Sequence, residues 1–299
     1  MAPGAPLAFA SAPDVAACAE RLARGASIEI NSLELEEFAA ARELLPRGQR
    51  IYVSHLPGQT WDQTVDLCAK VAGAGFDPIP HIPVRLLADR EQLAGVLRAA
   101  FDAGVREPLL LAGDYPKVRG PFSDVLAALR SGVLDAQGFR RVSFAGHPEG
   151  HPSVPIREIR QAQIDKWQQG NDRGFEVTFV TQFFFAAGPF TEWACDLRSA
   201  GVRARLVAGI AGPTGITRLL RLARRCGVGP SIRALTTRPS SLFSLMSDHD
   251  PDGLVRDLAV EWQRMAGLFD GIHLFSFGGF LRTVTWLRRY AGGGSRRVI

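Results

Sequence analysis

The chain has 299 residues, 46% of them hydrophobic, and a formal net charge of +5. This composition is typical of a globular protein with a sizeable core. The small positive excess suits anionic small molecules at least as well as nucleic acid, so no nucleic-acid partner is expected. No apolar run approaches the roughly 20 residues of a membrane span, and the N-terminal segment lacks the regions of a signal peptide. A membrane partner is therefore not expected either.

The cysteines are few and far apart, and they form no C-x-x-C pair. They are Cys18, Cys68, Cys195 and Cys226. This spacing favours neither a disulfide framework nor a metal site, and a reducing cytoplasm fits it best.

Helix signals occur at regular places along the chain. After a lead of residues 1–10 that is expected to be disordered, Ser11–Asp14 resembles a capping box, and Gly25 is placed to end that helix. Thr60 and Gln63 form a second box, and Asp89 is a candidate cap for another helix. Further helix-like segments follow near the C-terminus, at 214–226, 231–247 and 253–268.

Short β-branched or apolar runs alternate with these helical segments. They are 27–30, 50–55, 78–82, 108–113, 141–146, 177–182, 205–210 and 271–277. Runs of this length, bounded by Gly, Pro or Asp, are typical of strands that are buried on both faces in a parallel sheet. About eight strands alternating with helices predict an α/β fold, a single (β/α)8 TIM barrel over residues 1–299, with a disordered tail at 292–299.

In a barrel of this kind the functional site lies at the C-terminal ends of the strands. The residues that end the predicted strands are Glu29, His55, His81, Asp114, His147, Gln182, Gly209 and Ser276. Because each follows an apolar run, these residues are expected to converge on one mouth of the barrel.

Each candidate also has a structural interpretation. Glu29 could be a salt-bridge partner, or a general acid whose pKa burial raises. Asp114 could serve a turn or cap, Gln182 could satisfy barrel backbone, and His81 could be a hydrogen-bonded core histidine. His147 and a second histidine, His151, flank a turn, but no third ligand has zinc-site spacing, so no metal is expected.

Several familiar site motifs are missing from the sequence. No G-x-G-x-x-G follows the first predicted strand, and no G-x-x-x-x-G-K-[ST] occurs. Rossmann and P-loop nucleotide sites therefore have no support, and no nucleophile elbow indicates Ser/His/Asp catalysis.

The strand ends carry a family resemblance. GHPEGHP (146–152) resembles the A-x-P-E-x-H-P turn of methylenetetrahydrofolate reductases, and FVTQFFF (179–185) resembles their I-T-Q-x-F-F strand. The runs SIEI, IPHI, LLLAGD and GIHLFSF resemble further family segments, in family order, from about residue 27 to 285.

The resemblance implies a (β/α)8 barrel with FAD at its mouth, reduced by NAD(P)H and reoxidised by 5,10-methylenetetrahydrofolate in a ping-pong reaction of one-carbon metabolism. Glu29 would protonate the folate so that its imidazolidine ring opens. Asp114 would tune the flavin and hold the pterin, and Gln182 would bind the pterin. The remaining cofactor contacts would come from His81, Gly113, Gly146, His147, His151 and Lys166. Members of the family form dimers or tetramers, so the resemblance also makes a homo-oligomer an expectation for this chain.

The sequence also departs from the family pattern. The family's Arg in L-R-G-D is Ala112 here, His147 stands where Tyr is frequent, and the usual N-R after the eighth strand is replaced by Gly278 and Gly279. Arg282 is then the candidate for binding the folate glutamate. Two alternatives follow: a flavin-free enzyme that transfers hydride directly from NADH to folate, or a folate-binding barrel without catalysis.

Overall fold

The computed structural model describes residues 12–115, 117–226, 228 and 248–293. The predicted lead (1–10), the cap at Ser11, the helix-like segment 231–247 and residues 294–299 of the predicted tail lie outside the described residues.

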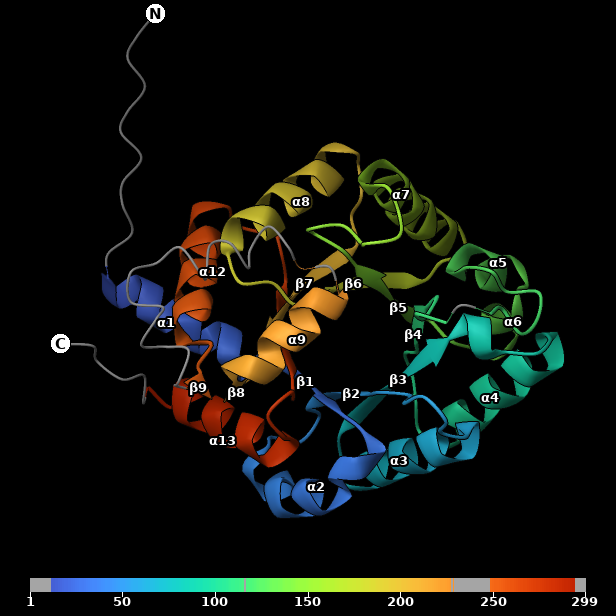
Figure 1. Ribbon diagram of the computed structural model, residues 1–299, viewed down its shortest axis with the longest axis horizontal. Helices are drawn as coiled ribbons and strands as arrows, with labels where there is room; N and C mark the ends of the chain where they lie inside the picture. Colours follow the sequence, from blue (N-terminus) through green and yellow to red (C-terminus); the bar gives the residue numbers. More distant parts are fainter. Residues whose placement is uncertain (1–11, 116, 227, 229–247, 294–299) are drawn as a thin grey trace, which may run out of the picture.

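Eight parallel strands close into a barrel, which confirms the predicted (β/α)8 fold (Figure 1). Around the barrel the order is β1-β10-β7-β6-β5-β4-β3-β2. The barrel strands are β1 (Ser27–Ile30), β2 (Arg50–Val53), β3 (Asp77–Pro83), β4 (Leu109–Leu111), β5 (Arg141–Gly146), β6 (Glu176–Thr181), β7 (Arg205–Ala211) and β10 (Gly271–Phe275). Each overlaps one of the predicted runs.

The structure describes the following helices, most of which form a ring around these strands (Figure 1). They are α1 (Ala12–Arg24), α2 (Leu35–Ala41), α3 (Trp61–Gly73), α4 (Arg90–Asp102), α5 (Val125–Arg130), α6 (Val133–Ala136), α7 (Ile156–Asp172), α8 (Ala187–Ser199), α9 (Ile216–Cys226), α12 (Asp252–Arg264) and α13 (Phe280–Ala291). Short 3-10 turns lie at η1 (Ser32–Glu34), η2 (Arg42–Leu44) and η3 (Val84–Leu86), and β8 (Thr214–Gly215) pairs antiparallel with β9 (Asp248–His249).

The predicted helix signals account for where several helices begin and end. The Thr60 hydroxyl accepts from the backbone N–H of Gln63, whose side chain accepts from the Thr60 N–H, so the capping box of α3 is confirmed. Asp89 caps α4 through the N–H of Gln92 at 2.7 Å. Helix α1 ends at Arg24, immediately before Gly25.

Apolar residues fill two layers, one on each side of the strands. Between strands and helices, a continuous cluster includes Ile28, Leu67 and Phe144. Inside the barrel, Tyr52, Ile79, Leu109, Val180 and Val207 form a second cluster. Burial on both faces explains why the strands are nearly continuous hydrophobic runs in the sequence.

A buried polar network lies inside the barrel, below the mouth. The Arg50 guanidinium and the Ser143 hydroxyl both donate to Glu107 Oε1, at 2.7 and 2.6 Å. The Tyr52 hydroxyl lies 3.3 Å from the Ser143 hydroxyl, and burial raises the pKa of Tyr52 to about 12, against the opposing charge of Arg50. The ion pair therefore compensates two charges that would be costly to bury alone.

Helix α9 lies over the mouth of the barrel rather than in the outer ring (Figure 1). Its apolar residues Ile216, Leu219 and Ala223 belong to a cluster with Phe183 of the loop after β6, and partly buried Phe275 and Phe277 pack against it. Among the described residues, no helix is both long and apolar enough to cross a membrane.

Candidate active site

A cavity of about 440 Å³ opens at the C-terminal ends of the barrel strands. This is the end at which (β/α)8 barrels carry their sites. Most residues that the sequence singled out line this cavity: Glu29, His81, Gly113, Asp114, His147, His151, Lys166 and Gln182. The structure therefore brings together residues from the ends of β1, β3, β4, β5 and β6 and from α7.

Two predicted contact residues do not line the cavity. Gly146 faces outward, because a Cβ atom there would lie 2.9 Å from the Trp193 ring of α8. Its carbonyl oxygen accepts a hydrogen bond from the Gln182 N–H at 2.8 Å, so it holds two strand ends together. Arg282 is exposed on α13.

Three other strand-end candidates have structural contacts instead. His55 hydrogen-bonds to Thr64 at 2.8 Å and stacks on the Trp61 ring. The Gly209 N–H donates to the Thr181 hydroxyl, and the Ser276 hydroxyl donates to Glu34. None of the three lines the cavity.

Glu29 lies between two histidines at the base of the cavity. Its Oε2 atom is 3.6 Å from His81 Nε2 and 3.9 Å from His273 Nε2. The other ring nitrogen of His273, Nδ1, is 2.9 Å from the Ser27 hydroxyl, which fixes the orientation of the imidazole. The Tyr52 ring packs edge-on against both histidines. One carboxylate and two imidazoles therefore form a compact acid–base cluster.

The prediction that burial raises the pKa of Glu29 above its ordinary value is wrong. Burial does push this pKa upward, as predicted, but His273, His81 and the Ser54 hydroxyl stabilise the carboxylate and hold the pKa below its ordinary value. Burial lowers the pKa of His81, with Glu29 opposing the shift. In the free protein at neutral pH, Glu29 is a carboxylate beside a largely neutral His81.

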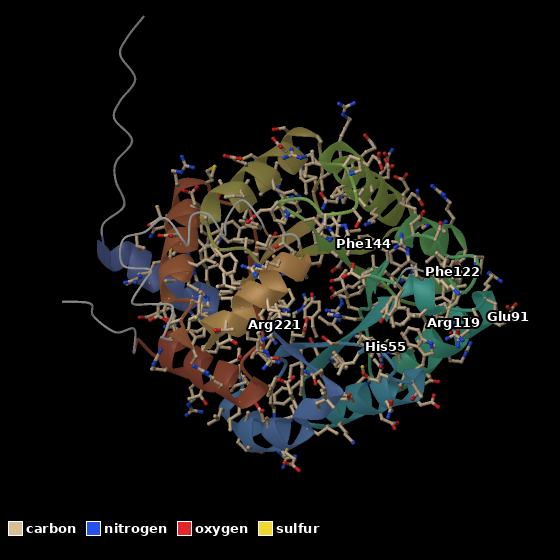
Figure 2. All side chains as sticks on the ribbon, in the orientation of Figure 1. His55, Glu91, Arg119, Phe122, Phe144 and Arg221 are labelled. Atoms are coloured by element: carbon tan, nitrogen blue, oxygen red, sulfur yellow. The ribbon has the colours of Figure 1, made fainter. Side chains whose placement is uncertain are left out.

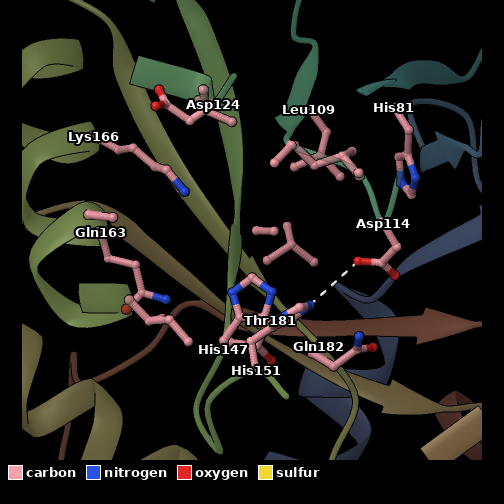
Figure 3. Close-up of a pocket in the computed structure, with 18 of the residues that line it drawn as sticks. His81, Leu109, Asp114, Asp124, His147, His151, Gln163, Lys166, Thr181 and Gln182 are labelled. Carbon is pink, nitrogen blue, oxygen red and sulfur yellow. Dashed lines mark ion pairs between the residues drawn. The ribbon is translucent and has the colours of Figure 1, made fainter. Parts of the chain in front are cut away.

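Asp114 and the two loop histidines lie across the cavity from Lys166 (Figure 3). The carboxylate of Asp114 is exposed, and its Oδ1 atom is 3.5 Å from His151 Nε2. The His151 ring meets the His147 ring edge-on. Burial, with the neighbouring charges of Lys166 and His151, lowers the pKa of His147 to about 4, so at neutral pH this imidazole is uncharged.

Lys166 projects from α7 into the cavity (Figure 3). Burial lowers its pKa to about 8, and the charge of Asp124 opposes the shift. Nearby, Gln163 accepts a hydrogen bond from the Trp193 ring at 2.9 Å, while its Nε2 atom is buried without a partner in the described structure. A ligand oxygen in this part of the cavity would satisfy both nitrogen groups.

Replacing Lys166 by methionine is expected to stabilise the protein at pH 7 by roughly 1 to 3 kcal/mol, discounted for partial exposure. The folded pKa of about 8 lies below the unfolded value of 10.5. The unfolded chain therefore binds the proton more tightly. The destabilisation caused by burying the charged Lys166 is complete below pH 8 and disappears as the pH rises to 10.5. Urea unfolding of parent and Lys166→Met protein from pH 7 to 10.5 measures this difference.

The matched control is Lys70→Met, which removes an exposed lysine from α3. It is expected to change the unfolding free energy by less than about 0.5 kcal/mol at every pH. If the difference in unfolding free energy between the parent and Lys166→Met stayed constant between pH 7 and 10.5, the lowered pKa of Lys166 would be contradicted.

Other cavity residues were not singled out from the sequence. Tyr52, Thr181, His273 and Phe275 point inward from the strands, and Arg85, Asp124, Glu158 and Gln163 reach the cavity from loops and α7. His273 and Phe275 were within reach of prediction, because alternate residues of a barrel strand face inward. The cavity residues from α5 and α7 could not be predicted, because they depend on how those helices pack against the barrel and no local sequence pattern indicates that packing.

No group of three or more His, Cys, Asp and Glu side chains among the described residues is arranged to hold a metal ion. The fold and the site together define a (β/α)8 barrel protein with a ligand cavity at the strand ends and an acid–base cluster at its base.

Comparison with known proteins places this barrel in a family. The family model described as methylenetetrahydrofolate reductase matches residues 54–262, and the chain belongs to this family. It is 24% identical over 212 residues to methylenetetrahydrofolate reductase 2 of Saccharomyces cerevisiae, covering 61% of this chain and 33% of the yeast protein. It is 28% identical over 154 residues to 5,10-methylenetetrahydrofolate reductase of Pectobacterium carotovorum, covering 52% of this chain and 50% of that protein. The chain thus spans half or less of the length of these relatives.

Solved structures share the fold at lower identity. An uncharacterized protein from Clostridium thermocellum that binds two copies of 5-methyl-5,6,7,8-tetrahydrofolic acid superposes with a TM-score of 0.58 at 12% identity, over 89% of this chain and 94% of that one. Oxaloacetate acetylhydrolase superposes with a TM-score of 0.50 at 13% identity, over 88% of this chain and 80% of that one.

Proposed function

We propose that this protein reduces 5,10-methylenetetrahydrofolate to 5-methyltetrahydrofolate with NAD(P)H. The observation that carries this proposal is that Glu29, Asp114 and Gln182 line one cavity. An acid, a pterin-binding carboxylate and a pterin-binding amide are what the family resemblance requires of these three residues. The family match over residues 54–262 supports the same conclusion.

The reaction needs one proton and one hydride. The proton goes to N10 of the folate, the bond from N10 to the methylene carbon breaks, and a cationic N5 iminium forms. Hydride from the nicotinamide then adds to the iminium carbon and leaves NAD(P)+. In the proposal Glu29 donates the proton, while Asp114 and Gln182 hold the pterin.

The cluster around Glu29 suits both steps. When the two rings fill the cavity and displace water, desolvation raises the pKa of Glu29 in the complex and lets it carry the proton. Once the proton has moved to N10, the carboxylate lies beside a cationic iminium and stabilises it. Ser27 and His273 keep the carboxylate in place through the contacts described above.

The described charges inside the cavity do not provide a site for the pyrophosphate of FAD. The carboxylates of the lining are Glu29, Asp114, Asp124 and Glu158, and its Arg and Lys side chains are Arg85 and Lys166. Arg85 is already engaged with the carbonyl oxygens of Ser123 and Gly113, and Asp124 occupies the N-cap of α5. Ala112 lines the cavity where the resemblance leads one to expect an arginine.

We favour direct hydride transfer from a nicotinamide to the folate while both rings occupy the cavity, because Ala112 stands where the resemblance implies an arginine that contacts the flavin phosphate. A flavin-mediated ping-pong reaction remains the second candidate, supported by the family resemblance. The two routes make different demands on the purified protein, because only the second needs a bound chromophore.

The proposed function is tested by mixing purified protein with NADH or NADPH and 5,10-methylenetetrahydrofolate without oxygen. Nicotinamide oxidation that depends on folate, with an equal amount of 5-methyltetrahydrofolate formed, is the expected result. An absorbance spectrum free of flavin bands, and a rate unchanged by added FAD, would support the direct route. Ligand binding without turnover under all these conditions would leave a folate-binding barrel and overturn the enzyme proposal.

The rate is expected to fall with rising pH. Because the free-protein pKa of Glu29 is lowered below 4.5, the protonated form is a minor species throughout the neutral range. If that form is required, log kcat/KM should decrease by about one per pH unit between roughly pH 6 and 8. If log kcat/KM did not change with pH over this range, the requirement for the protonated form of Glu29 would be contradicted.

Gln182→Ala is expected to raise the KM for folate by about tenfold or more and to change kcat little. The amide lines the cavity, and its loss removes a hydrogen bond made to the pterin in ground and transition states alike. Steady-state kinetics with varied folate measures this effect. Unchanged folate affinity in a direct titration would remove Gln182 from the pterin site.

A further inference from the structure

Helix α9 is strongly amphipathic, and its apolar face fixes it at the cavity mouth. Ile216, Leu219 and Ala223 are buried in the cluster over the barrel end. Cys226, at the end of the same helix, lines the cavity. The helix is therefore held beside the cavity by its buried face and turns the opposite face to solvent.

That exposed face carries a row of arginines, Arg218, Arg221 and Arg224, spaced three residues apart. We call these three residues the α9 ridge. In the view down the barrel Arg221 projects inside the ring of outer helices (Figure 2). Residues at this spacing are neighbours on a helix surface, so their positive charges repel one another.

Nothing in the described structure neutralises the ridge. The sequence of α9, ITRLLRLARRC, contains no Asp or Glu, and none of the three arginines forms a hydrogen bond or ion pair with a described residue. Elsewhere in the chain, arginines such as Arg24 and Arg173 pair with Glu20 and Asp135. The α9 ridge is therefore a local concentration of uncompensated positive charge.

The lining of the cavity has the opposite character. Among the described residues it carries four carboxylates, of which Asp114, Asp124 and Glu158 are exposed, and two basic side chains. By net charge, an anionic group is therefore less favoured at this lining than at the ridge beside the mouth. Each substrate of the proposed function joins a ring of low charge to a polyanion: the diphosphate of the nicotinamide dinucleotide, or the glutamate carboxylates of folate.

We propose that the α9 ridge binds the polyanionic end of a substrate whose ring lies in the cavity. This inference rests on the proposed function, which supplies the two substrates. Arginine suits the role because its guanidinium group forms paired hydrogen bonds to phosphate and to carboxylate. The shared chemistry is a flexible polyanion tethered to a buried ring, and binding measurements separate its two sources.

The experiment compares the parent protein with the triple variant Arg218→Gln, Arg221→Gln, Arg224→Gln. Glutamine preserves helix propensity, and the three side chains are exposed, so folding should be retained. Affinities are measured by titration calorimetry for NADH and for the reduced nicotinamide riboside, which lacks phosphate. The folate pair is pentaglutamyl 5-methyltetrahydrofolate and 5-methyltetrahydropterin, which lacks glutamate.

We expect the variant to bind at least one polyanionic ligand about tenfold or more weakly, with a shallower salt dependence, and to bind its uncharged counterpart as the parent does. Weaker binding of NADH alone assigns the ridge to the diphosphate, and weaker binding of the pentaglutamate alone assigns it to the carboxylates. Loss of both means that the ridge serves both substrates. Unchanged affinity for both polyanions overturns the proposal.

A matched control removes three arginines from the other end of the barrel. Arg98, Arg130 and Arg288 are exposed and lie near the C-terminal ends of α4, α5 and α13, where the helices approach the opposite face. Their replacement by glutamine should leave all four affinities unchanged. An equal loss of affinity in this control would mean that net charge, and not the position of the ridge, determines binding.

If the parent binds neither NADH nor folate, the proposed function fails together with this inference. Parent binding that the ridge variant leaves intact defeats this inference alone.

Discussion

Glu29→Gln is expected to slow folate reduction by about two orders of magnitude or more, while NADH and folate still bind. Glutamine keeps the size of the side chain and its contacts with His81 and His273, but it carries no acidic proton at neutral pH. The loss should therefore appear in kcat, measured with both substrates saturating. The slope of log kcat/KM against pH should disappear with it, because the titrating group is gone.

The matched control is Glu158→Gln. Glu158 also lines the cavity, but it is exposed at the start of α7 and forms no ion pair with a described histidine. Its replacement should change kcat by less than about threefold. If Glu29→Gln turned over at the parent rate, the proton would have to come from another group, and the role given to Glu29 would be wrong.

Arg50→Met is expected to destabilise the protein by about 3 to 5 kcal/mol. The substitution leaves the Glu107 carboxylate, only 3% exposed, without its positive partner inside the barrel. The hydrogen bond from Ser143 remains, but one hydroxyl does not replace a cation. The midpoint of urea unfolding, followed by circular dichroism and by tryptophan fluorescence, measures the loss and shows whether a single transition describes it.

Two comparisons make this result specific. Arg264→Met removes an exposed partner of Glu261 and should cost less than about 1 kcal/mol. The double variant Arg50→Met, Glu107→Gln removes both buried charges and should recover much of the stability that Arg50→Met loses. A single Arg50→Met variant as stable as the parent would mean that water reaches the Glu107 carboxylate.

The barrel could be predicted from the sequence because both faces of each strand are buried. Runs such as VTFVTQ and RLVAGI are mainly apolar or β-branched, and the helix caps at Thr60 and Asp89 mark where helices begin after two of the strands. Strand ends were harder to place. The predicted run 271–277 led to Ser276, whereas β10 stops at Phe275 and Ser276 turns toward Glu34.

The site could be predicted only in part, because the last residue of a strand does not always face the cavity. Alternation along β10 turns His273 inward, where it contacts Glu29, and alternation along β5 turns Gly146 outward against Trp193. The pKa of Glu29 could not be inferred from burial alone, because its direction depends on two histidines that approach from other strands. Contacts made between distant parts of the chain set the chemistry here.

The most direct test of direct hydride transfer uses NADH with two deuterium atoms at C4 of the nicotinamide, in ordinary water. If hydride passes directly between the two rings, every 5-methyltetrahydrofolate formed carries one deuterium in its methyl group. A route through a flavin would pass the hydrogen through an exchangeable N–H group, so product that has lost the label would contradict the direct route. Absence of any folate-dependent NADH oxidation would contradict the proposed reduction itself.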